Sequence, residues 1–287
     1  MLAEADQDER YLLEQQFRYT YASPVRSLRH RLVVVPRAVH GTQQRFDHGL
    51  SVTGGAARAK PTSDAFANHV VEIRATGVEE WIQFDTWALV GVQDGRGVSE
   101  LPPNWAGRGD LLAPTPLTHP DAGLAEAAAH LSAISSGPMD LAERACSWTY
   151  QAMSYEYGIT DVHTDAVTAL TEGRGVCQDY AHVMLALCHA ARLPARYVSG
   201  HLVGEGGSHA WVEVIVQDQS PGYETRWVAV AFDPTHNRRA GRGYVTVAVG
   251  RDYSDVAPTS GTFEGTGPGV LSVRKRLSPT EAPHPGT

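Results

Sequence analysis

Cysteine is scarce in this chain of 287 residues, which carries only Cys146, Cys177 and Cys188. An odd number of cysteines excludes a complete set of internal disulfides, so free thiols in a reducing compartment are expected. No stretch approaches the roughly 20 apolar residues that span a bilayer. The first ten residues, MLAEADQDER, are acidic and lack an apolar run. We therefore expect no signal peptide, no membrane partner and a cytoplasmic location.

Clustered positive charge is also lacking. The formal net charge is −8, and basic residues gather only in the short run Arg274-Lys275-Arg276. A nucleic-acid surface requires a basic patch or stripe, so no nucleic-acid partner is expected. The remaining composition, 42% hydrophobic and 20% charged, is that of an ordinary globular protein. The length suits about two domains, and the oligomeric state is not indicated.

Short alternating segments fill the first third of the chain. Strands are predicted over residues 17–21, 27–36, 69–74 and 81–84, with turn residues between them. The pattern favours an antiparallel β-sandwich-like N-terminal domain over residues 11–92. Residues 93–120 are rich in glycine and proline, which disfavour both helix and strand, so they are interpreted as a linker.

The second half places helices before strands. Helices are predicted over residues 121–134, 139–155, 166–171 (capped by Asp165) and 177–192, and strands over 195–202, 210–216, 226–232 and 243–249. This order is typical of an α+β domain, here residues 121–252. Residues 253–287 are predicted to be an extended C-terminal segment, with disorder over its last residues, 279–287.

Cys177 has the surroundings of a reactive thiol. It follows Gly173-Arg174-Gly175-Val176 and begins the strongest predicted helix. Glycines permit a sharp turn, and the free N–H groups of a helix N-terminus stabilise a thiolate or receive an oxyanion. A buried structural cysteine is the alternative, and it is the interpretation favoured for Cys146 and Cys188.

His209 and Asp233 are the candidate partners of this thiol. His209 opens a predicted strand after a glycine-rich loop, and Asp233 ends the next strand before Pro234. If the two strands form a hairpin, antiparallel pairing brings the two side chains together, so that the carboxylate orients the imidazole. Taken singly, a loop histidine and a turn-capping aspartate are common.

Three motifs together resemble the transglutaminase-like superfamily. They are Gly175-Val176-Cys177-Gln178-Asp179-Tyr180-Ala181, His209-Ala210-Trp211-Val212-Glu213-Val214 and Phe232-Asp233-Pro234-Thr235. The N-terminal half is similar to the β-rich domain of the bacterial branch, which includes cysteine proteases. Where that branch usually has glycine before an asparagine, this chain has Ala67 before Asn68.

The resemblance implies a papain-like catalytic domain with Cys177 as nucleophile, His209 as general base and acid, and Asp233 as the residue that orients it. It also implies supporting or pocket roles for Gln178, Asp179, Tyr180 and Trp211, with Gln178 or the Cys177 backbone N–H as oxyanion donor. We expect a thiol-dependent amide or peptide hydrolase that forms an acyl-thioester on Cys177. An amine acyltransferase is the alternative, and an inactive binding scaffold is a second.

No cofactor or metal is expected. His201, His209, Cys177 and Asp233 lack the close ligand spacing of a zinc site. The glycine-rich loop at residues 204–208 lacks the Gly-Lys-Ser/Thr ending of a phosphate-binding loop and precedes a strand. The expected partner is therefore a peptide or amide substrate, with proteins among the candidates.

Overall fold

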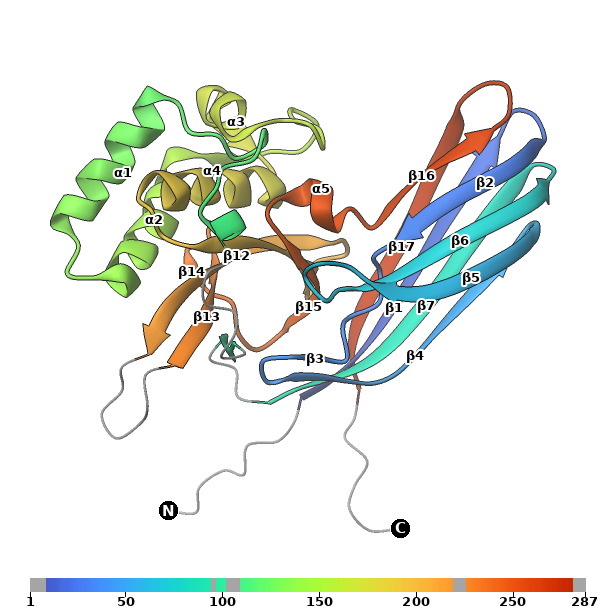
Figure 1. Ribbon diagram of the computed structural model, residues 1–287, viewed down its shortest axis with the longest axis horizontal. Coiled ribbons are helices and arrows are strands. Elements are labelled where there is room, and N and C mark those ends of the chain that lie inside the picture. Colours follow the sequence, from blue (N-terminus) through green and yellow to red (C-terminus); the bar gives the residue numbers. More distant parts are fainter. Residues whose placement is uncertain (1–8, 94–96, 102–108, 219–225, 281–287) are drawn as a thin grey trace, which may run out of the picture.

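The computed structural model describes residues 9–93, 97–101, 109–218 and 226–280. The fold is mixed α+β, with a β-sandwich domain beside a domain of helices packed on an antiparallel sheet (Figure 1). The expected fold class is thus confirmed. In the described parts of the chain, no helix combines the length and apolar character needed to cross a membrane.

Alternation of apolar and polar residues builds the β-sandwich domain. β1 (Glu9–Tyr21) buries every second side chain from Tyr11 to Phe17, and β7 (Trp81–Val92) does so from Ile82 to Val90. Because successive side chains of a strand point to opposite faces, each sheet gains one buried face. The two faces enclose a core that includes Phe17, Ile82 and Phe84.

Both sheets of the sandwich are antiparallel. Their strand orders are β17-β1-β7-β4-β3 and β16-β2-β6-β5. The other strands are β2 (Val25–Leu32), β3 (Val39–His40), β4 (Gln43–Thr53), β5 (Ala56–Ser63), β6 (His69–Val78), β16 (Thr259–Glu264) and β17 (Gly269–Thr280). β3, β4 and β5 were not predicted, since β4 and β5 are largely exposed and lack a strong apolar pattern.

The C-terminal part of the chain returns to the sandwich, which corrects the expected domain boundary. β16 pairs with β2, and β17 pairs with β1 along twelve positions from Tyr21–Gly269 to Arg10–Thr280. Residues 259–280 therefore belong to the N-terminal domain. Disorder was expected from residue 279, but Pro279 and Thr280 pair with β1, and residues 281–287 lie outside the described residues. β17 was missed because most of its side chains are exposed.

The α+β domain follows the predicted order closely. Its helices are α1 (Ala122–Ile134), α2 (Pro138–Ala152), α3 (Ala166–Glu172), α4 (Cys177–Ala190) and the short α5 (Tyr253–Val256). Asp165 caps α3 as expected, since its Oδ1 accepts from Thr168 N at 2.8 Å. The main sheet has the order β14-β13-β12-β11-β15, all antiparallel, formed by β11 (Ala195–Leu202), β12 (His209–Asp218), β13 (Arg226–Asp233), β14 (Arg238–Arg239) and β15 (Tyr244–Gly250).

The described part of the expected linker packs against this sheet. β8 (Val98–Glu100) pairs with β13, and the 3-10 helix η2 (Gly109–Leu111) places Leu111 against Ile215 and Ala229. Residues 94–96 and 102–108 of the predicted linker lie outside the described residues. The linker interpretation therefore needs correction, because these segments are part of the α+β domain.

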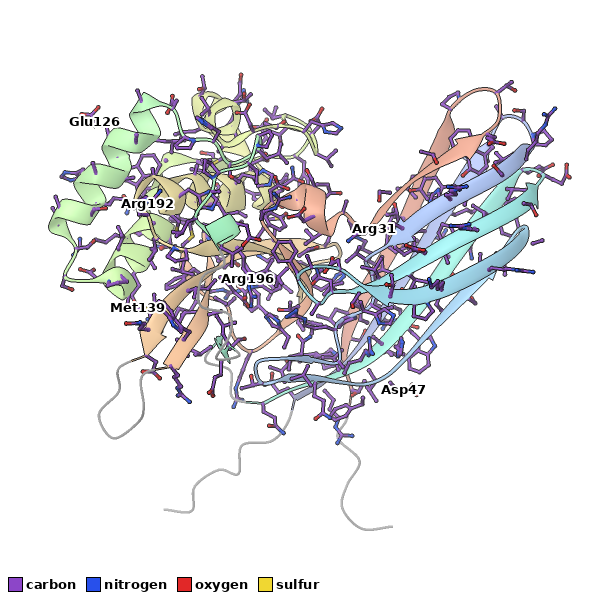
Figure 2. The ribbon with its side chains drawn as sticks, viewed as in Figure 1. Arg31, Asp47, Glu126, Met139, Arg192 and Arg196 are labelled. Atoms are coloured by element: carbon purple, nitrogen blue, oxygen red, sulfur yellow. The ribbon has the colours of Figure 1, made fainter. Side chains whose placement is uncertain are left out.

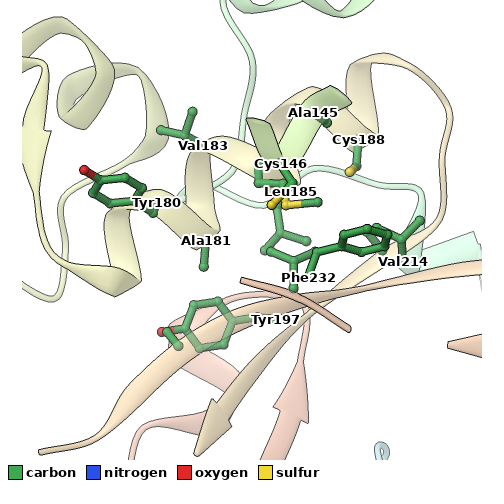
Figure 3. Close-up of a cluster of buried hydrophobic side chains, with 14 of the residues drawn as sticks. Ala145, Cys146, Tyr180, Ala181, Val183, Leu185, Cys188, Tyr197, Val214 and Phe232 are labelled. Carbon is green, nitrogen blue, oxygen red and sulfur yellow. The ribbon is translucent and has the colours of Figure 1, made fainter. Parts of the chain in front are cut away.

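Helix α4 is the centre of the α+β core. Every residue from Gln178 to His189 is buried, because α1, α2 and α3 cover one side of the helix and β11 and β12 the other. Figure 3 shows side chains of α2 and α4 gathered over Tyr197, Val214 and Phe232 of the sheet. A helix enclosed on all sides holds its N-terminus in a fixed place.

Two side-chain amides of the sandwich form hydrogen bonds with the backbone of the edge strand β15. Gln43 donates to Thr246 O at 2.8 Å and accepts from Thr246 N at 2.8 Å. Asn68 donates to Val249 O at 2.7 Å and accepts from Val249 N at 2.9 Å. A carboxamide carries one acceptor and two donors, so each of these reproduces the pairing that a further strand would supply. The sandwich thereby satisfies a sheet edge that is otherwise open to other chains.

A buried ion cluster ties the same two domains together. Glu213 accepts from His40 Nε2 at 2.6 Å and from Arg196 Nε at 2.6 Å, and all three residues are buried. Figure 2 labels Arg196 near the region where the domains meet. Burial acts to raise the pKa of Glu213, but the charges of Arg196 and His40 outweigh it and hold that pKa well below its usual range.

Replacing Ala67 by glycine should stabilise the fold. Ala67 has φ +59°, a left-handed conformation that costs a residue with a Cβ about 1–2 kcal/mol. Glycine removes this strain but loses more entropy on folding, so Ala67→Gly is expected to raise the free energy of unfolding by about 0.5–1 kcal/mol. Denaturant unfolding would measure it. The control is Ala125→Gly, at an exposed position of α1, which should lose about 1 kcal/mol. Equal losses from both substitutions would contradict the strain at Ala67.

Replacing Glu213 by glutamine should destabilise the protein by about 3 kcal/mol at neutral pH, because Arg196 loses its buried counter-charge. The folded-state pKa of Glu213 is depressed, so its contribution is present above the unfolded pKa of about 4.3 and is lost as pH falls below it. The difference between wild type and Glu213→Gln should therefore shrink on acidification. Denaturant unfolding at several pH values would test this, with the exposed Glu126→Gln as a control. A difference that is constant with pH would contradict the ionic role of Glu213.

Candidate active site

The turn before α4 places Cys177 at a helix N-terminus. Gly173 ends α3 with φ +63°, and β10 (Arg174–Gly175) then pairs with β9 (Ser154–Tyr155). Gly175 has no room for a side chain, since a Cβ there would lie 2.5 Å from Asp179 Oδ2. Cys177 is the first residue of α4 and is partly exposed. Its thiol thus sits where the unpaired N–H groups of the helix point.

Asp179 fixes the start of this helix. Its Oδ2 accepts from Val176 N at 2.7 Å and from Thr160 Oγ1 at 2.7 Å. Burial raises the pKa of Asp179, although both hydrogen bonds oppose the rise. The carboxylate therefore holds the turn in front of Cys177 in place.

His209 and Asp233 meet at the end of a β-hairpin. The antiparallel pairing of β12 and β13 ends at Val212 and Phe232. Just past this end of the ladder, His209 Nε2 donates to Asp233 Oδ2 at 2.8 Å. Both residues are almost fully buried. The structure thus brings together the two side chains that the sequence placed at the ends of neighbouring strands.

Asp233 is saturated with hydrogen bonds. Its Oδ2 also accepts from His236 Nδ1 at 2.7 Å and Tyr244 Oη at 2.6 Å, while Oδ1 accepts from the backbone N–H groups of Thr235 and His236. Burial acts to raise the pKa of Asp233, but these donors hold it well below its usual range. The carboxylate is therefore ionised and rigidly held. Tyr244 and His236 were not predicted.

Two aromatic rings pack against the imidazole of His209. Trp211 stacks on it with ring centroids 6.0 Å apart, and Tyr244 lies at the same centroid distance. Gly200 makes room for the indole, since a Cβ there would lie 2.4 Å from Trp211 Cη2. Burial acts to lower the pKa of His209, but its interactions with Asp233, Cys177 and Glu205 raise it to about 12.

The second ring nitrogen of His209 is the one left for chemistry. Nδ1 lies 3.1 Å from Glu205 Oε2, yet it makes no well-aligned hydrogen bond with any described residue. Glu205 also approaches His236, with 3.3 Å between Oε1 and Nε2. The close approach of His209 is the main cause of a lowered pKa for Glu205, and it outweighs burial, which acts in the opposite direction. Glu205 was missed because it belongs to the glycine-rich loop, where its side chain has no periodic signal.

The other predicted site residues have structural partners. Gln178 Nε2 donates to Asp161 O at 3.3 Å, so its amide is already engaged. Tyr180 is buried, with its ring 6.4 Å from that of Tyr155. His201 Nδ1 donates to Gly207 O at 3.0 Å and anchors the glycine-rich loop. In the described part of the chain, the group whose ligand atoms lie close enough to share a metal ion is Glu205, His209 and His236, and it does not include His201.

A cavity of about 750 Å³ opens beside His236 and Glu205. Its walls carry aromatic side chains from α2, β9 and α4 together with the glycine-rich loop, namely Tyr150, Gln151, Met153, Ser154, Tyr155, Tyr157, Tyr180, Glu205, Gly206, Gly207, Ser208, Thr235 and His236. Such a cavity has the size of a small-ligand or peptide pocket. From the sandwich, Lys275 of β17 reaches the same loop, where Nζ donates to Ser208 Oγ at 3.2 Å.

Comparison with known proteins finds a family match in each of the two domains. Residues 126–232 match the family described as "Transglutaminase-like superfamily", and residues 11–88 match "Bacterial transglutaminase-like N-terminal region". The chain belongs to the transglutaminase-like superfamily.

Relatives of this superfamily member are bacterial. An uncharacterized protein of Mycobacterium leprae is 36% identical over 174 residues, which are 57% of this chain and 58% of that protein. An uncharacterized protein of Mycobacterium tuberculosis is 26% identical over an alignment that covers 95% of this chain and 93% of that protein. A crystal structure from Cytophaga hutchinsonii, described as a "putative cysteine protease", has a TM-score of 0.74 at 22% identity over 96% of this chain and 92% of that one. That likeness shows the shared fold.

The three thiols of this transglutaminase-like chain should differ sharply in reactivity. Cys146 and Cys188 are buried, and burial raises the pKa of each to about 12. Cys177 is partly exposed beside His209. Iodoacetamide at neutral pH should therefore label Cys177 at least about tenfold faster, as read by timed peptide mapping. Unfolding in guanidinium is the control, because it should remove the difference. Equal labelling of all three thiols in the folded protein would contradict the assignment.

Proposed function

We propose that this protein is a thiol-dependent hydrolase of amide or peptide bonds, working through an acyl-thioester on Cys177. The observation that carries the proposal is the setting of His209. One ring nitrogen is bound to the buried Asp233 carboxylate, and the ring interacts with the Cys177 thiol at the start of α4. A nucleophile, a base and a residue that orients the base are the parts that acyl transfer needs.

Acylation begins with a proton on His209 and a thiolate on Cys177. The sulfur attacks the substrate carbonyl carbon, and the carbonyl electron pair moves to oxygen. The oxyanion is stabilised by the backbone N–H of Cys177 at the helix N-terminus. When the intermediate collapses, the C–N bond breaks and His209 gives its proton to the leaving amine.

Deacylation reverses these roles. A water molecule donates its proton to His209 as its oxygen attacks the thioester carbon, and the carbon–sulfur bond then breaks to release a carboxylic acid. Asp233 keeps one orientation and one tautomer of His209 through both steps, since its Oδ2 holds Nε2 at 2.8 Å. Tyr244 supports that carboxylate by donating to it at 2.6 Å.

The acyl acceptor separates a hydrolase from a transferase, because both share the acyl-enzyme. Electrophilic amide and peptide probes that trap an acyl group on Cys177 would identify the substrate class. The product formed with and without an added primary amine would then identify the acceptor. We propose water, so that the carboxylic acid dominates in both cases. None of these steps requires a metal, so a chelator should not lower the rate.

Kinetics of variants on one substrate identified with the probes should distinguish the roles of Cys177, His209 and Asp233. By analogy with serine triads, Cys177→Ala and His209→Ala should each lower kcat by roughly 10⁶-fold, and Asp233→Asn by roughly 10⁴-fold. The double substitution of Cys177 and Asp233 should be scarcely worse than Cys177→Ala alone, because the members act as a unit. His130→Ala, an exposed histidine on α1, is the matched control and should be silent.

Two results would count against this assignment. If Asp233→Asn were silent while His209→Ala was inactive, Asp233 would be a turn residue only. If the losses from Cys177 and Asp233 simply multiplied, the two would not belong to one constellation. Circular dichroism of each variant would separate these results from unfolding.

A further inference from the structure

Three possible metal ligands converge beside the cavity that Glu205 and His236 line. They are His209 Nδ1, His236 Nε2 and the Glu205 carboxylate, and their ligand atoms all lie within 4.8 Å of one another. Glu205 Oε2 lies 3.1 Å from His209 Nδ1, and Glu205 Oε1 lies 3.3 Å from His236 Nε2. A carboxylate between two imidazole nitrogens is a donor set that suits a first-row transition metal.

Asp233 orients both imidazoles toward this point. Its Oδ2 accepts from His209 Nε2 at 2.8 Å and from His236 Nδ1 at 2.7 Å. Each ring therefore turns its other nitrogen away from Asp233 and toward Glu205. A carboxylate that holds the far nitrogen of a ligating histidine is the usual support of a zinc site, since it fixes the tautomer and raises the basicity of the ligand.

His209 Nδ1 lies close to Glu205, but without a well-aligned hydrogen bond. It is a buried nitrogen that makes no well-aligned hydrogen bond with the described residues, and only 1% of the His209 side chain is exposed. An unsatisfied buried polar atom is costly, and ligation of an ion would satisfy it. The ion would displace a proton, because a histidine ligates metal in its neutral form.

An ion can reach this point from solvent. Glu205 and His236 line the cavity of about 750 Å³, and about 36% of each side chain is exposed. Two imidazoles and a carboxylate, with a fourth position left for water, form a common tetrahedral arrangement around Zn²⁺. Mg²⁺ and Ca²⁺ prefer sets made of oxygen atoms and are disfavoured here.

We propose that Glu205, His209 and His236 form a binding site for Zn²⁺ that reversibly blocks the proposed hydrolase. Binding ties up the ring nitrogen of His209 that exchanges a proton with Cys177, so the ion inhibits and takes no part in catalysis. The site itself is independent of the proposed function, and only its inhibitory effect rests on it. His236 and Glu205 are thereby assigned a role outside the Cys177, His209 and Asp233 constellation.

Zinc binding to the full chain can be measured without a substrate. Equilibrium dialysis with ZnCl₂, followed by metal analysis, would be run on the Cys177→Ala protein, so that this thiol cannot ligate the ion. One equivalent should bind, and His236→Ala and Glu205→Gln in the same background should each weaken it by more than about tenfold, since even supporting residues change metal affinity 10–100-fold. The matched controls His130→Ala and Glu126→Gln, both exposed on α1, should bind as the parent does. MgCl₂ should not compete.

Several outcomes of the dialysis would overturn the site. Absence of binding would do so, and so would binding that is unchanged by both His236→Ala and Glu205→Gln, because the ion would then be held elsewhere. Glu205 lies on an exposed loop, so Glu205→Gln remains a valid test if His236→Ala fails to fold. The visible spectrum of bound Co²⁺ gives a second readout, since loss of its tetrahedral bands in Glu205→Gln would support the assigned ligand.

The inhibitory effect needs a separate measurement in protein with Cys177 intact. Zn²⁺ should slow the alkylation of Cys177 by iodoacetamide at least about tenfold, and this protection should be lost in His236→Ala. Full zinc occupancy without protection would overturn the inhibition. If Cys177 is unreactive even without zinc, the proposed hydrolase fails while the dialysis result stands.

Discussion

The site depends on one buried carboxylate. Asp233 ends β13 with no exposed surface, and its two oxygens accept from His209, His236, Tyr244 and two backbone N–H groups. A buried anion is stable only when it is fully hydrogen-bonded, so these donors cannot be rearranged independently. The orientation of both histidines follows from that requirement. Antiparallel pairing of β12 and β13 puts His209 within reach, and the edge strand β15 supplies Tyr244.

The sandwich protects that arrangement from outside the site. Tyr244 begins β15, an edge strand on which the backbone groups of Thr246 and Val249 are paired by Gln43 and Asn68 of the sandwich. Without these amides, the edge would expose N–H and C=O groups that invite pairing with other chains. The buried cluster of Glu213, Arg196 and His40 joins the domains on the neighbouring strands. The sandwich therefore has a structural role, because it holds the sheet that carries His209, Asp233 and Tyr244.

Local patterns predicted most of the α+β domain and the candidate triad. Helix α4 was recognisable from glycines followed by a helical repeat, and β11 was predicted with the bounds it has. The partners of Asp233 were not predictable in this way. His236 reaches it from the turn after β13 and Tyr244 from the edge strand β15, so their contacts depend on tertiary packing. β16 and β17 were missed for a related reason, because pairing with β2 and β1 more than 200 residues away decides their conformation.

The two ring nitrogens of His209 differ in how firmly their partners are held. Nε2 is bound to a carboxylate that is buried, ionised and fixed by four other donors, so this side of the ring cannot relax. Nδ1 faces Cys177 and Glu205, and Glu205 lies on a loop where a Cβ at Gly204, Gly206 or Gly207 would meet open space. The hydrogen bond at Nε2 fixes the orientation of the ring, while Nδ1 can interact with different partners. A proton exchanged with the thiol and an ion shared with Glu205 and His236 require the same lone pair, so one excludes the other. Asp233 orients His209 in the same way for proton exchange and for ion binding. The two differ in their use of Glu205, which ligates the ion and takes no part in the exchange with Cys177.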